Sequence, residues 1–389
     1  MKPLLIAILL LFINCHCYAQ KEFDNMAISS GLIYNVNSDE ITKLDKKVQY
    51  GQFAVSDEDG NLLFYGDACN IFDKNGASLY SSFNGESGLS GSSCIAISPK
   101  NHNQYFIFNS YYKQHYHEFE NILFVAHYFI VTNTNGKLTV EERILNQFEN
   151  RTLTDGCLFA RMFPYPDKDK IWFVYYYTDK FVSCLMDGND IIKTVESNCD
   201  IFDDVDNTHS ALIKNIISNP EYNMAILFKN GIIDFDNFTG KITRNNTFKM
   251  PDDMDTYAFS QSGKYLYAAM RLSVNEIKIS RFMVADLSKG IVDNEEVIFT
   301  YTDDDNEINN TLSTSNFYLH PNSTIYAFYG KRYLSKIENA DADKPIITIK
   351  AVRLPKSGLT VVADYFHPIT NSKSFCETFA DKKPKIICE

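Results

Sequence analysis

The sequence predicts an all-β fold: a β-propeller of seven four-stranded blades closed by an N-terminal strand, with six or eight blades as the alternatives. One strand-turn-strand pattern recurs along the chain. Aromatic residues make up 14% of the sequence, with 29 Phe and 24 Tyr, and these residue types suit half-buried pleated surfaces. Beyond the first twenty residues, no segment keeps a 3.6-residue apolar period over the length of a helix, so we expect few helices.

Each copy of the pattern consists of an apolar strand, a polar turn that often contains Pro or Gly, and an aromatic-rich strand. The turns follow one another at intervals close to the roughly 40–50 residues of a four-stranded blade, with longer second and fifth intervals. The copies span residues 53–65, 94–108, 160–175, 213–228, 256–269, 316–329 and 363–376. Their matching turn positions are Ser56, Ser98, Tyr165, Asn219, Ser260, His320 and His367.

The two ends of the repeat array predict how the ring closes. Residues 377–389, which follow the seventh copy, are too few to complete a blade. A strand-like run at residues 31–36 precedes the first copy, and we expect it to pair with the last blade. Closure of this kind removes exposed edge strands. We therefore predict a single propeller domain over residues 20–389.

The first residues have the pattern of an export signal. An apolar run at residues 4–13 follows a single cationic residue and is shorter than a bilayer-spanning helix. Ala19 ends a segment that resembles a signal-peptidase site, so residues 1–19 are predicted to be a signal peptide. A lipid anchor at Cys15 or Cys17 is the alternative. No later run has spanning length, and we expect a periplasmic, cell-surface or secreted protein without a membrane span.

Charge and cysteine content exclude several classes of partner and cofactor. The formal net charge is −12, and no basic cluster is longer than Lys382-Lys383. We therefore expect neither nucleic acid nor anionic lipid as a partner. The cysteines that follow the predicted signal are odd in number and lack CxxC spacing, so zinc is not expected.

Several of the strand-and-turn segments resemble one known family. They are residues 56–67 (SDEDGNLLFYGD), Ile171-Trp172, 231–241 (GIIDFDNFTGK), 332–337 (RYLSKI) and 353–359 (RLPKSGL). Together they are similar to repeats of secreted β-propeller modules of Bacteroidota, the type often found beside PKD repeats and a C-terminal sorting domain. The resemblance implies a WD40-like propeller fold. It implies no established reaction and supplies no catalytic residues.

Two sets of residues are weak candidates for metal ligands. His115 and His117 would face the same side of a strand, and with His127 they offer imidazoles of the kind that bind metals. No motif supplies the remaining ligands, and an exposed polar loop explains the same residues. Acidic runs at residues 203–206 and 302–307 would suit calcium, although solvated loops explain them too. No other cofactor is expected.

The architecture itself predicts a ligand-binding position. In a propeller, the residues that enter the first strand of each blade gather around one mouth of the central channel, where many such rings bind ligands. A polar, water-filled channel would have the same composition. By the repeat alignment these residues are Gln52, Ser93, Asp155, His209, Asp255, Asn316 and Asp364.

These observations favour an exported, non-catalytic binding or scaffold module that recognises a protein or a glycan through a propeller face. No constellation of catalytic residues stands out in the sequence, and rigid rings with varied loops suit recognition. The alternative is a hydrolase that acts on a polysaccharide or a lactone at the channel mouth. The identity of the ligand and the oligomeric state are not encoded in any motif.

Overall fold

The regular structure of this chain is almost entirely β-strand. The exceptions among the described residues are a 3₁₀-helix, η1 (Lys21–Phe23), and a four-residue α-helix, α2 (Val284–Leu287). The all-β prediction is confirmed. The computed structural model describes residues 21–29, 31–48, 52–81, 88–114, 122–150, 160–166, 169–177, 180–198, 217–219, 224–227, 231–250, 254, 256–273, 276–302, 317–320, 323–329, 333–353 and 366–368.

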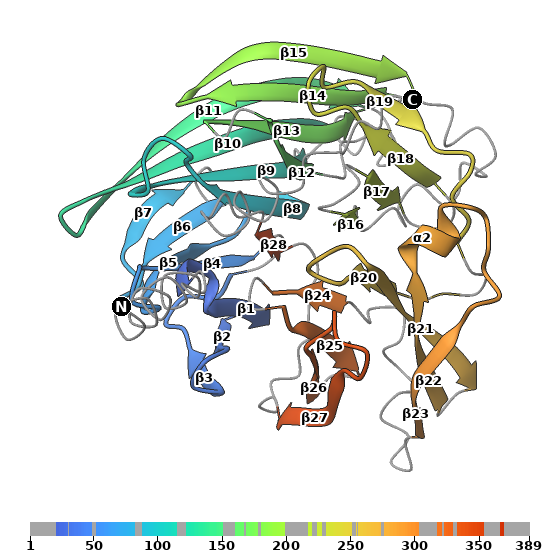
Figure 1. Cartoon of the computed structure of the whole chain (residues 1–389). Helices are drawn as coiled ribbons and strands as arrows, with labels where there is room; N and C mark the ends of the chain where they lie inside the picture. Colours follow the sequence, from blue (N-terminus) through green and yellow to red (C-terminus); the bar gives the residue numbers. More distant parts are fainter. Residues whose placement is uncertain are drawn as a thin grey trace, which may run out of the picture.

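The strands form successive antiparallel meanders arranged in a ring (Figure 1). In six sheets of the described chain, four consecutive strands pair in sequence order, and the first strand lies nearest the centre. This arrangement is a β-propeller, as predicted. The first three of these sheets contain β4 (Phe53–Ser56), β5 (Leu62–Gly66), β6 (Asn70–Asp73), β7 (Ser78–Ser81); β8 (Gly88–Ile97), β9 (Gln104–Gln114), β10 (Ile122–Thr134), β11 (Lys137–Asn150); and β12 (Ala160–Pro164), β13 (Lys170–Tyr177), β14 (Lys180–Asp187), β15 (Asp190–Asn198).

The next three sheets continue the ring in the same order. Each sheet follows its predecessor around the centre (Figure 1). The sheets contain β16 (Ile217–Asn219), β17 (Met224–Leu227), β18 (Gly231–Phe235), β19 (Ile242–Arg244); β20 (Thr256–Phe259), β21 (Tyr265–Ser273), β22 (Glu276–Met283), β23 (Glu296–Thr302); and β24 (Phe317–Leu319), β25 (Ile325–Tyr329), β26 (Tyr333–Glu338), β27 (Ile346–Arg353). A longer segment, residues 284–295 with α2, joins β22 to β23.

The first six predicted repeat copies coincide with the first two strands of these six sheets. The matching turn residues Ser56, Ser98, Ser260 and His320 are all buried. At Ser260 the hydroxyl accepts a hydrogen bond from the backbone N–H of Tyr265 at 3.1 Å, which holds the turn shut. Buried polar residues therefore lie at four of these turns, and at Ser260 the hydroxyl supports the hairpin from inside.

The N-terminal residues close the ring as a sheet of their own. Strands β1 (Asn25–Ser29), β2 (Leu32–Asn35) and β3 (Glu40–Lys43) form a three-stranded antiparallel sheet. It lies between the sheets β4–β7 and β24–β27 (Figure 1). The N-terminal segment thus completes the ring. The sequence predicts that the run at residues 31–36 pairs with the last blade. Within the described residues this prediction is wrong, because β2, which lies in that run, pairs with β1 and β3.

Specific contacts hold this closing sheet on both sides. The side-chain amide of Asn25 donates to the hydroxyl of Ser56 at 2.9 Å and to the carbonyl of Gly60 at 2.9 Å. On the other side, Nε2 of His320 lies 3.0 Å from the carbonyl oxygen of Phe23. The rings of Tyr34 and Tyr326 meet edge to face with centroids 5.9 Å apart. The first and last sheets are thereby joined through the N-terminus.

The described part of the seventh predicted copy is one short strand, β28 (Phe366–Pro368). It pairs in parallel with β8, on the side of that strand that faces the ring centre (Figure 1). The rest of the copy lies outside the described residues. The described chain therefore has seven sheets, but the seventh consists of the N-terminal strands alone.

Apolar clusters fill the space between consecutive sheets. One cluster joins the closing sheet to its neighbours on both sides and includes Phe53, Tyr34 and Tyr326. Others lie between the later pairs of sheets, for example around Phe108 and Phe173, whose rings stack with centroids 3.7 Å apart. Because each sheet covers its neighbour, burial of apolar area extends around the ring. None of the described helices has the length and apolarity needed to cross a bilayer.

A buried carboxyl group at the closing sheet makes ring closure depend on pH. Asp24 is only 2% exposed, and burial raises its pKa to about 6 from the usual 3.8. The folded state therefore favours the protonated form. The stability that this proton contributes is complete below about pH 4 and is lost as the pH rises through about 6.

We predict that Asp24→Asn removes this loss of stability. Asn is neutral at every pH, and its side-chain oxygen still accepts from Asn37, which donates to Asp24 in the native chain. Between about pH 4.5 and about pH 7, the free energy of unfolding of the variant should improve relative to the native chain by about 1–3 kcal/mol. Urea titration at both pH values measures this change. The exposed control Asp293→Asn should show no such change, and an equal pH response of D24N and native chain would contradict the prediction.

Candidate functional site

Two of the predicted channel-mouth residues lie within the described chain. Gln52 is buried directly before β4. Ser93 lies in β8, where it pairs with Asn109 of β9 and with Phe366 of β28. The other five, Asp155, His209, Asp255, Asn316 and Asp364, lie outside the described residues. A ligand site at the channel mouth, and with it the hydrolase alternative, stays a prediction.

Of the three histidines proposed as metal ligands, the structure describes His127. Its ring is fully buried between the sheets β4–β7 and β8–β11. Nδ1 lies 2.6 Å from a carboxylate oxygen of Glu142, and Nε2 lies 3.2 Å from the carbonyl oxygen of Ala68. Tyr80 also donates to Glu142. His115 and His117 lie outside the described residues, as do residues 203–206 and 303–307 of the acidic runs.

These contacts make His127 a structural residue. Both of its ring nitrogens lie within hydrogen-bond distance of an oxygen atom of the protein, at Glu142 and at Ala68. The hydrogen bond from His127 lowers the pKa of Glu142, so the partner is a carboxylate. Within the part of the chain that the structure describes, no three His, Cys, Asp or Glu side chains form a group suited to a metal ion.

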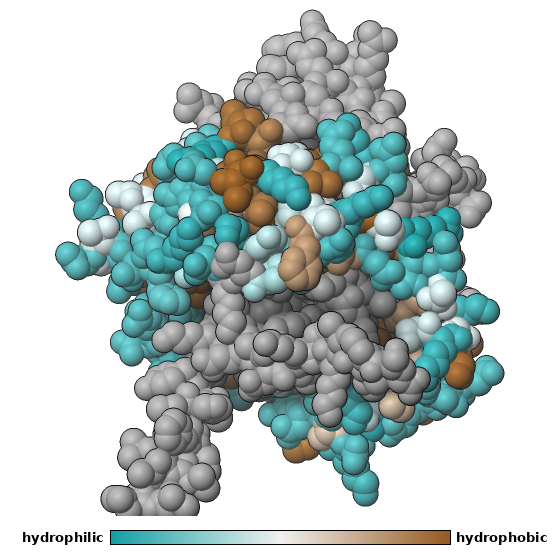
Figure 2. All heavy atoms as spheres, turned by 45° about the horizontal axis from the view of Figure 1, so that its top comes forward, coloured by the Kyte–Doolittle hydropathy of each residue, from teal (hydrophilic) through white to brown (hydrophobic). Residues whose placement is uncertain are grey.

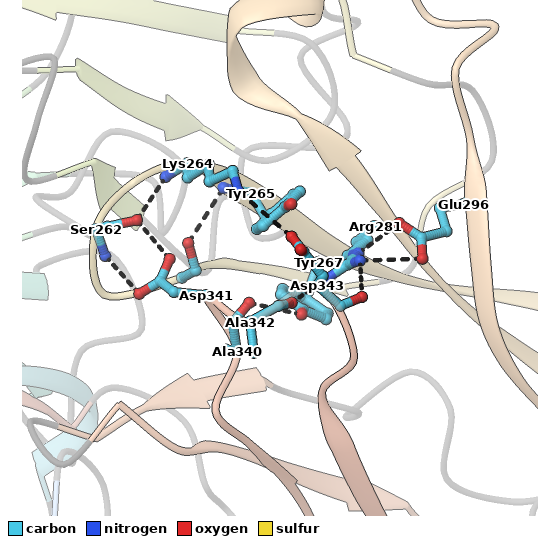
Figure 3. A network of polar contacts seen from close by, with 11 residues as sticks. Ser262, Lys264, Tyr265, Tyr267, Arg281, Glu296, Ala340, Asp341, Ala342 and Asp343 are labelled. Carbon is cyan, nitrogen blue, oxygen red and sulfur yellow. Dashed lines mark hydrogen bonds and ion pairs between the residues drawn. The ribbon is translucent and has the colours of Figure 1, made fainter.

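A polar network joins the sheets β20–β23 and β24–β27 (Figure 3). Arg281 is 3% exposed and donates to both carboxylate oxygens of Glu296, at 2.7 and 3.0 Å. It also donates to the carbonyl oxygens of Ala342 and Asp343, each at 2.6 Å. Its guanidinium carbon lies 4.3 Å from the centroid of the Tyr265 ring. Four hydrogen bonds thus hold the guanidinium, and the network acts as a clamp between sheets.

The same junction shows how a turn is attached to its neighbour. The hydroxyl of Tyr267 donates to the carbonyl of Ala340 at 2.7 Å. Burial raises the pKa of Tyr267 to about 12, so the hydroxyl remains a donor at neutral pH. The backbone N–H of Ser262 donates to Asp341 at 2.9 Å (Figure 3). The turn between β26 and β27 is thereby fastened to the preceding sheet.

A comparable junction lies between the sheets β12–β15 and β16–β19, and its outer turn exposes Phe238 to solvent. The only tryptophan of the chain, Trp172 on β13, is fully buried there. Its indole N–H donates to the carbonyl of Asn237, in the turn between β18 and β19, at 2.7 Å. Its ring meets Phe235 edge to face with centroids 6.0 Å apart. Trp172 is therefore the base on which this turn rests.

Gly240 allows the turn to lie directly on the indole. Its φ is +80°, in the left-handed region that glycine adopts most readily. A Cβ atom at this position would lie 2.3 Å from Cη2 of Trp172, well inside van der Waals contact. Any larger residue would displace either the indole or the turn.

The turn is held rigidly by Asp236. Its carboxylate accepts from the backbone N–H groups of Phe238 at 2.9 Å and Thr239 at 3.2 Å, and from the Thr239 hydroxyl at 2.7 Å. The hydroxyl contact in particular lowers the pKa of Asp236, which keeps it ionised at neutral pH. The Gly240 N–H donates to the Asp236 carbonyl at 2.7 Å. The backbone of the turn is therefore preorganised.

The rigid turn carries Phe238, whose side chain is 66% exposed. Its ring centroid lies 6.5 Å from that of the half-buried Tyr165. Lys193 lies over Trp172 at 5.5 Å from the ring centroid, and its ammonium donates to the Thr239 carbonyl at 3.0 Å. We call Phe238, Tyr165, Lys170, Lys193 and Lys241 the Phe238 surface. It combines a large exposed ring with cationic neighbours.

Other exposed apolar residues include Ile144 and Ile192. Figure 2 shows hydrophobic residues gathered among hydrophilic ones on the face that comes forward from the top of Figure 1, where β11 and β15 lie. Single exposed aliphatic residues are common on soluble proteins and need no functional explanation. Phe238 differs because it is aromatic, held on a fixed turn and placed beside a second aromatic ring.

Sequence reasoning did not identify the Phe238 surface. The sequence places Phe238 in a glycine-containing turn, and Tyr165 at a turn position of the repeat. An aromatic residue within a short polar turn was the available signal, because turns project into solvent. That Lys193 contacts both Trp172 and the Thr239 carbonyl depends on the packing of one sheet against the next.

No protein-family model matches the sequence, and no curated protein sequence does. Similar solved structures include TolB from Acinetobacter baumannii, at 11% identity and a TM-score of 0.36, with 83% of this chain and 79% of that chain covered. Another is the β-propeller domain of Cps50 (Swd1) from Myceliophteria thermophila, at 10% identity and a TM-score of 0.41, with 80% and 91% covered. The Trypanosoma rangeli sialidase is similar at 8% identity and a TM-score of 0.30, with 85% and 57% covered. The likenesses are remote, and the fold assignment depends on this chain's own sheets.

We predict that Gly240→Ala is far more destabilising than Gly136→Ala. Both glycines have positive φ, at +80° and +84°, so both substitutions incur backbone strain of about 1–2 kcal/mol. Only at Gly240 does the new methyl group meet Trp172, whereas nothing lies within 4 Å at Gly136. Overpacking should add about 1–3 kcal/mol to the loss in G240A.

Chemical denaturation measures the two losses of stability. Because Trp172 is the only tryptophan, native-state fluorescence also reports directly on this junction. G240A should shift the indole emission toward the red, while G136A should leave it unchanged. Equal stability of the two variants, with identical emission spectra, would show that the turn does not rest on Trp172 in solution.

Proposed function

We propose that this chain is an exported, non-catalytic binding or scaffold protein of the cell envelope or the extracellular space, which engages a protein or a glycan through the Phe238 surface. The observation that carries the proposal is the presentation of Phe238: a 66% exposed ring on a turn fixed by Asp236 and Trp172. Export through the predicted signal peptide, residues 1–19, and kinship with the secreted propeller modules of Bacteroidota are parts of the same proposal.

The energetic argument concerns preorganisation. An aromatic side chain contributes a large apolar area to an interface, and aromatic residues are enriched among the residues that dominate binding energy. Ordering a flexible loop on binding reduces affinity. The Phe238 turn avoids that cost because Asp236, Trp172 and Lys193 already hold it. The turn therefore has the properties of a binding anchor.

We predict that a photoreactive benzoylphenylalanine at position 238 crosslinks to a partner in the envelope or secreted fraction of cells that express the full chain. The reactive ring replaces an aromatic ring at a position where it contacts solvent in the free protein. The same residue at position 346, which is 55% exposed on a different sheet, serves as the control.

Competition tests the specificity of the crosslink. Excess unlabelled native chain should suppress the adduct, whereas excess Phe238→Ala should not. Far-ultraviolet circular dichroism and thermal unfolding of F238A establish that it is folded. Absence of an adduct at 238, or equal suppression by native chain and F238A, would count against a binding role for this surface.

A further inference from the structure

We propose that the partner of the Phe238 surface is an extended protein segment that carries apolar side chains and carboxylates on the same face, so that the apolar groups cover Phe238 and the carboxylates face Lys170, Lys193 and Lys241. This inference rests on the proposed function and specifies the chemistry of its partner. It is argued from the charges around the exposed ring, from their fixed positions and from the apolar character of the ring itself.

The cations of the Phe238 surface contrast with the rest of the molecule. The chain as a whole has a formal net charge of −12. Lys241 is exposed directly after the turn, and Lys193 is exposed on the outer strand β15. Lys170, at the start of β13, has its ammonium 5.4 Å from the centroid of the Tyr165 ring. Opposite charges across an interface steer encounter and select partners, which here favours an anionic partner.

The positions of two of these cations are set by aromatic faces. A cation over an aromatic ring is attracted to it electrostatically. Lys193 is held over Trp172 and by the carbonyl of Thr239, and Lys170 is held over Tyr165. Both ammonium groups are thereby kept close to Phe238, since the rings of Tyr165 and Trp172 lie 6.4 Å apart.

The acidic groups nearby do not cancel this charge arrangement completely. Asp236 uses its carboxylate to accept three hydrogen bonds from its own turn, so it points into the turn. Asp169 precedes Lys170 in the chain and is exposed. Asp187, which lies opposite Lys170 across β13 and β14, makes an ion pair with Lys100. Among these described residues, four lysines and three aspartates leave a cationic balance.

The exposed ring favours a peptide over a glycan. Phe238 has no polar atom, and the free energy gained by covering it depends on the apolar area removed from water. Aliphatic side chains supply such area. In an extended segment residues i and i+2 lie on the same face, so an apolar residue and a carboxylate two positions apart can both face the Phe238 surface. An anionic glycan would satisfy the lysines but would leave much of the ring against polar groups.

The test uses three short fluorescein-labelled peptides and the full mature chain, with binding followed by fluorescence anisotropy. Each peptide has Ser at every second position, so that the remaining residues share one face of an extended segment. On that face the first peptide alternates Leu and Glu, the second alternates Leu and Lys, and the third alternates Ser and Glu. The Leu-Glu peptide should bind most tightly. Its affinity should fall about tenfold with Phe238→Ala, as for an interface anchor, and several-fold with Lys193→Met, which keeps the aliphatic stem but removes the charge.

Salt and a matched control complete the design. Added NaCl should weaken binding of the Leu-Glu peptide to the native chain, because exposed charges are screened. Ile346→Ala, at an exposed apolar residue of a different sheet, should leave binding unchanged. The inference is overturned if the Leu-Lys peptide binds as tightly as the Leu-Glu peptide, or if F238A binds like the native chain. It is equally overturned if an oligogalacturonate binds in a Phe238-dependent manner and the peptides do not.

The experiments can reject the proposed binding role and the proposed chemistry of the partner independently. A specific crosslink from position 238 together with equal or absent binding of the peptides would retain the binding role and reject an acidic apolar segment as its partner. Absence of both the crosslink and peptide binding would reject both. Binding of the Leu-Glu peptide that is lost in F238A supports the inference, and the peptide then serves as a competitor in the crosslinking experiment.

Discussion

At three of its junctions the ring depends on hydrogen bonds that one sheet donates to the backbone carbonyls of the next sheet's outer turn. Tyr128 donates to Asn189 at 3.1 Å, Trp172 to Asn237 at 2.7 Å and Tyr267 to Ala340 at 2.7 Å. In each case the acceptor lies in the turn between the third and fourth strands of the following sheet. A turn carbonyl that is covered by a neighbour loses its water, and leaving it without a donor would cost free energy. The apolar clusters bring the sheets together, and these donors set the position of one sheet on the next.

The need to satisfy buried polar groups also explains the position of the closing sheet. A ring of meanders leaves one junction at which no covalent connection joins neighbours, here between β24–β27 and β4–β7. The three N-terminal strands occupy that junction and satisfy polar groups on both sides, with Asn25 donating to Gly60 and His320 contacting the Phe23 carbonyl. Asp24 lies in the middle of these contacts and is buried. A carboxyl group whose pKa is raised by burial is therefore located beside the sheet that closes the ring.

The Phe238 surface is a consequence of the inter-sheet contacts. Trp172 and Gly240 place the turn on the preceding sheet, Asp236 closes the turn on itself, and Phe238 is the residue left facing outward. The Arg281 clamp also joins two sheets, but its guanidinium already donates hydrogen bonds to carbonyl oxygens of the neighbouring sheet. This difference separates a junction that only joins two sheets from one that also presents a side chain. His127 belongs to a junction of the first kind, since Glu142 contacts one of its ring nitrogens and Ala68 contacts the other.

Local pattern was sufficient for the strands and their order. Alternating apolar residues and glycine turns predict the hairpins at 53–65 and 256–269, because strand formation depends on neighbours in sequence. The pairing of β2 with β1 and β3, and of β28 with β8, depends on which sheet edge is free, and no local pattern records that. The burial of His127 and the contact of Lys193 with the Phe238 turn are likewise not visible in the local sequence. Both depend on how closely one sheet approaches the next, and that distance is set by contacts between residues far apart in the chain, such as Trp172 with Asn237.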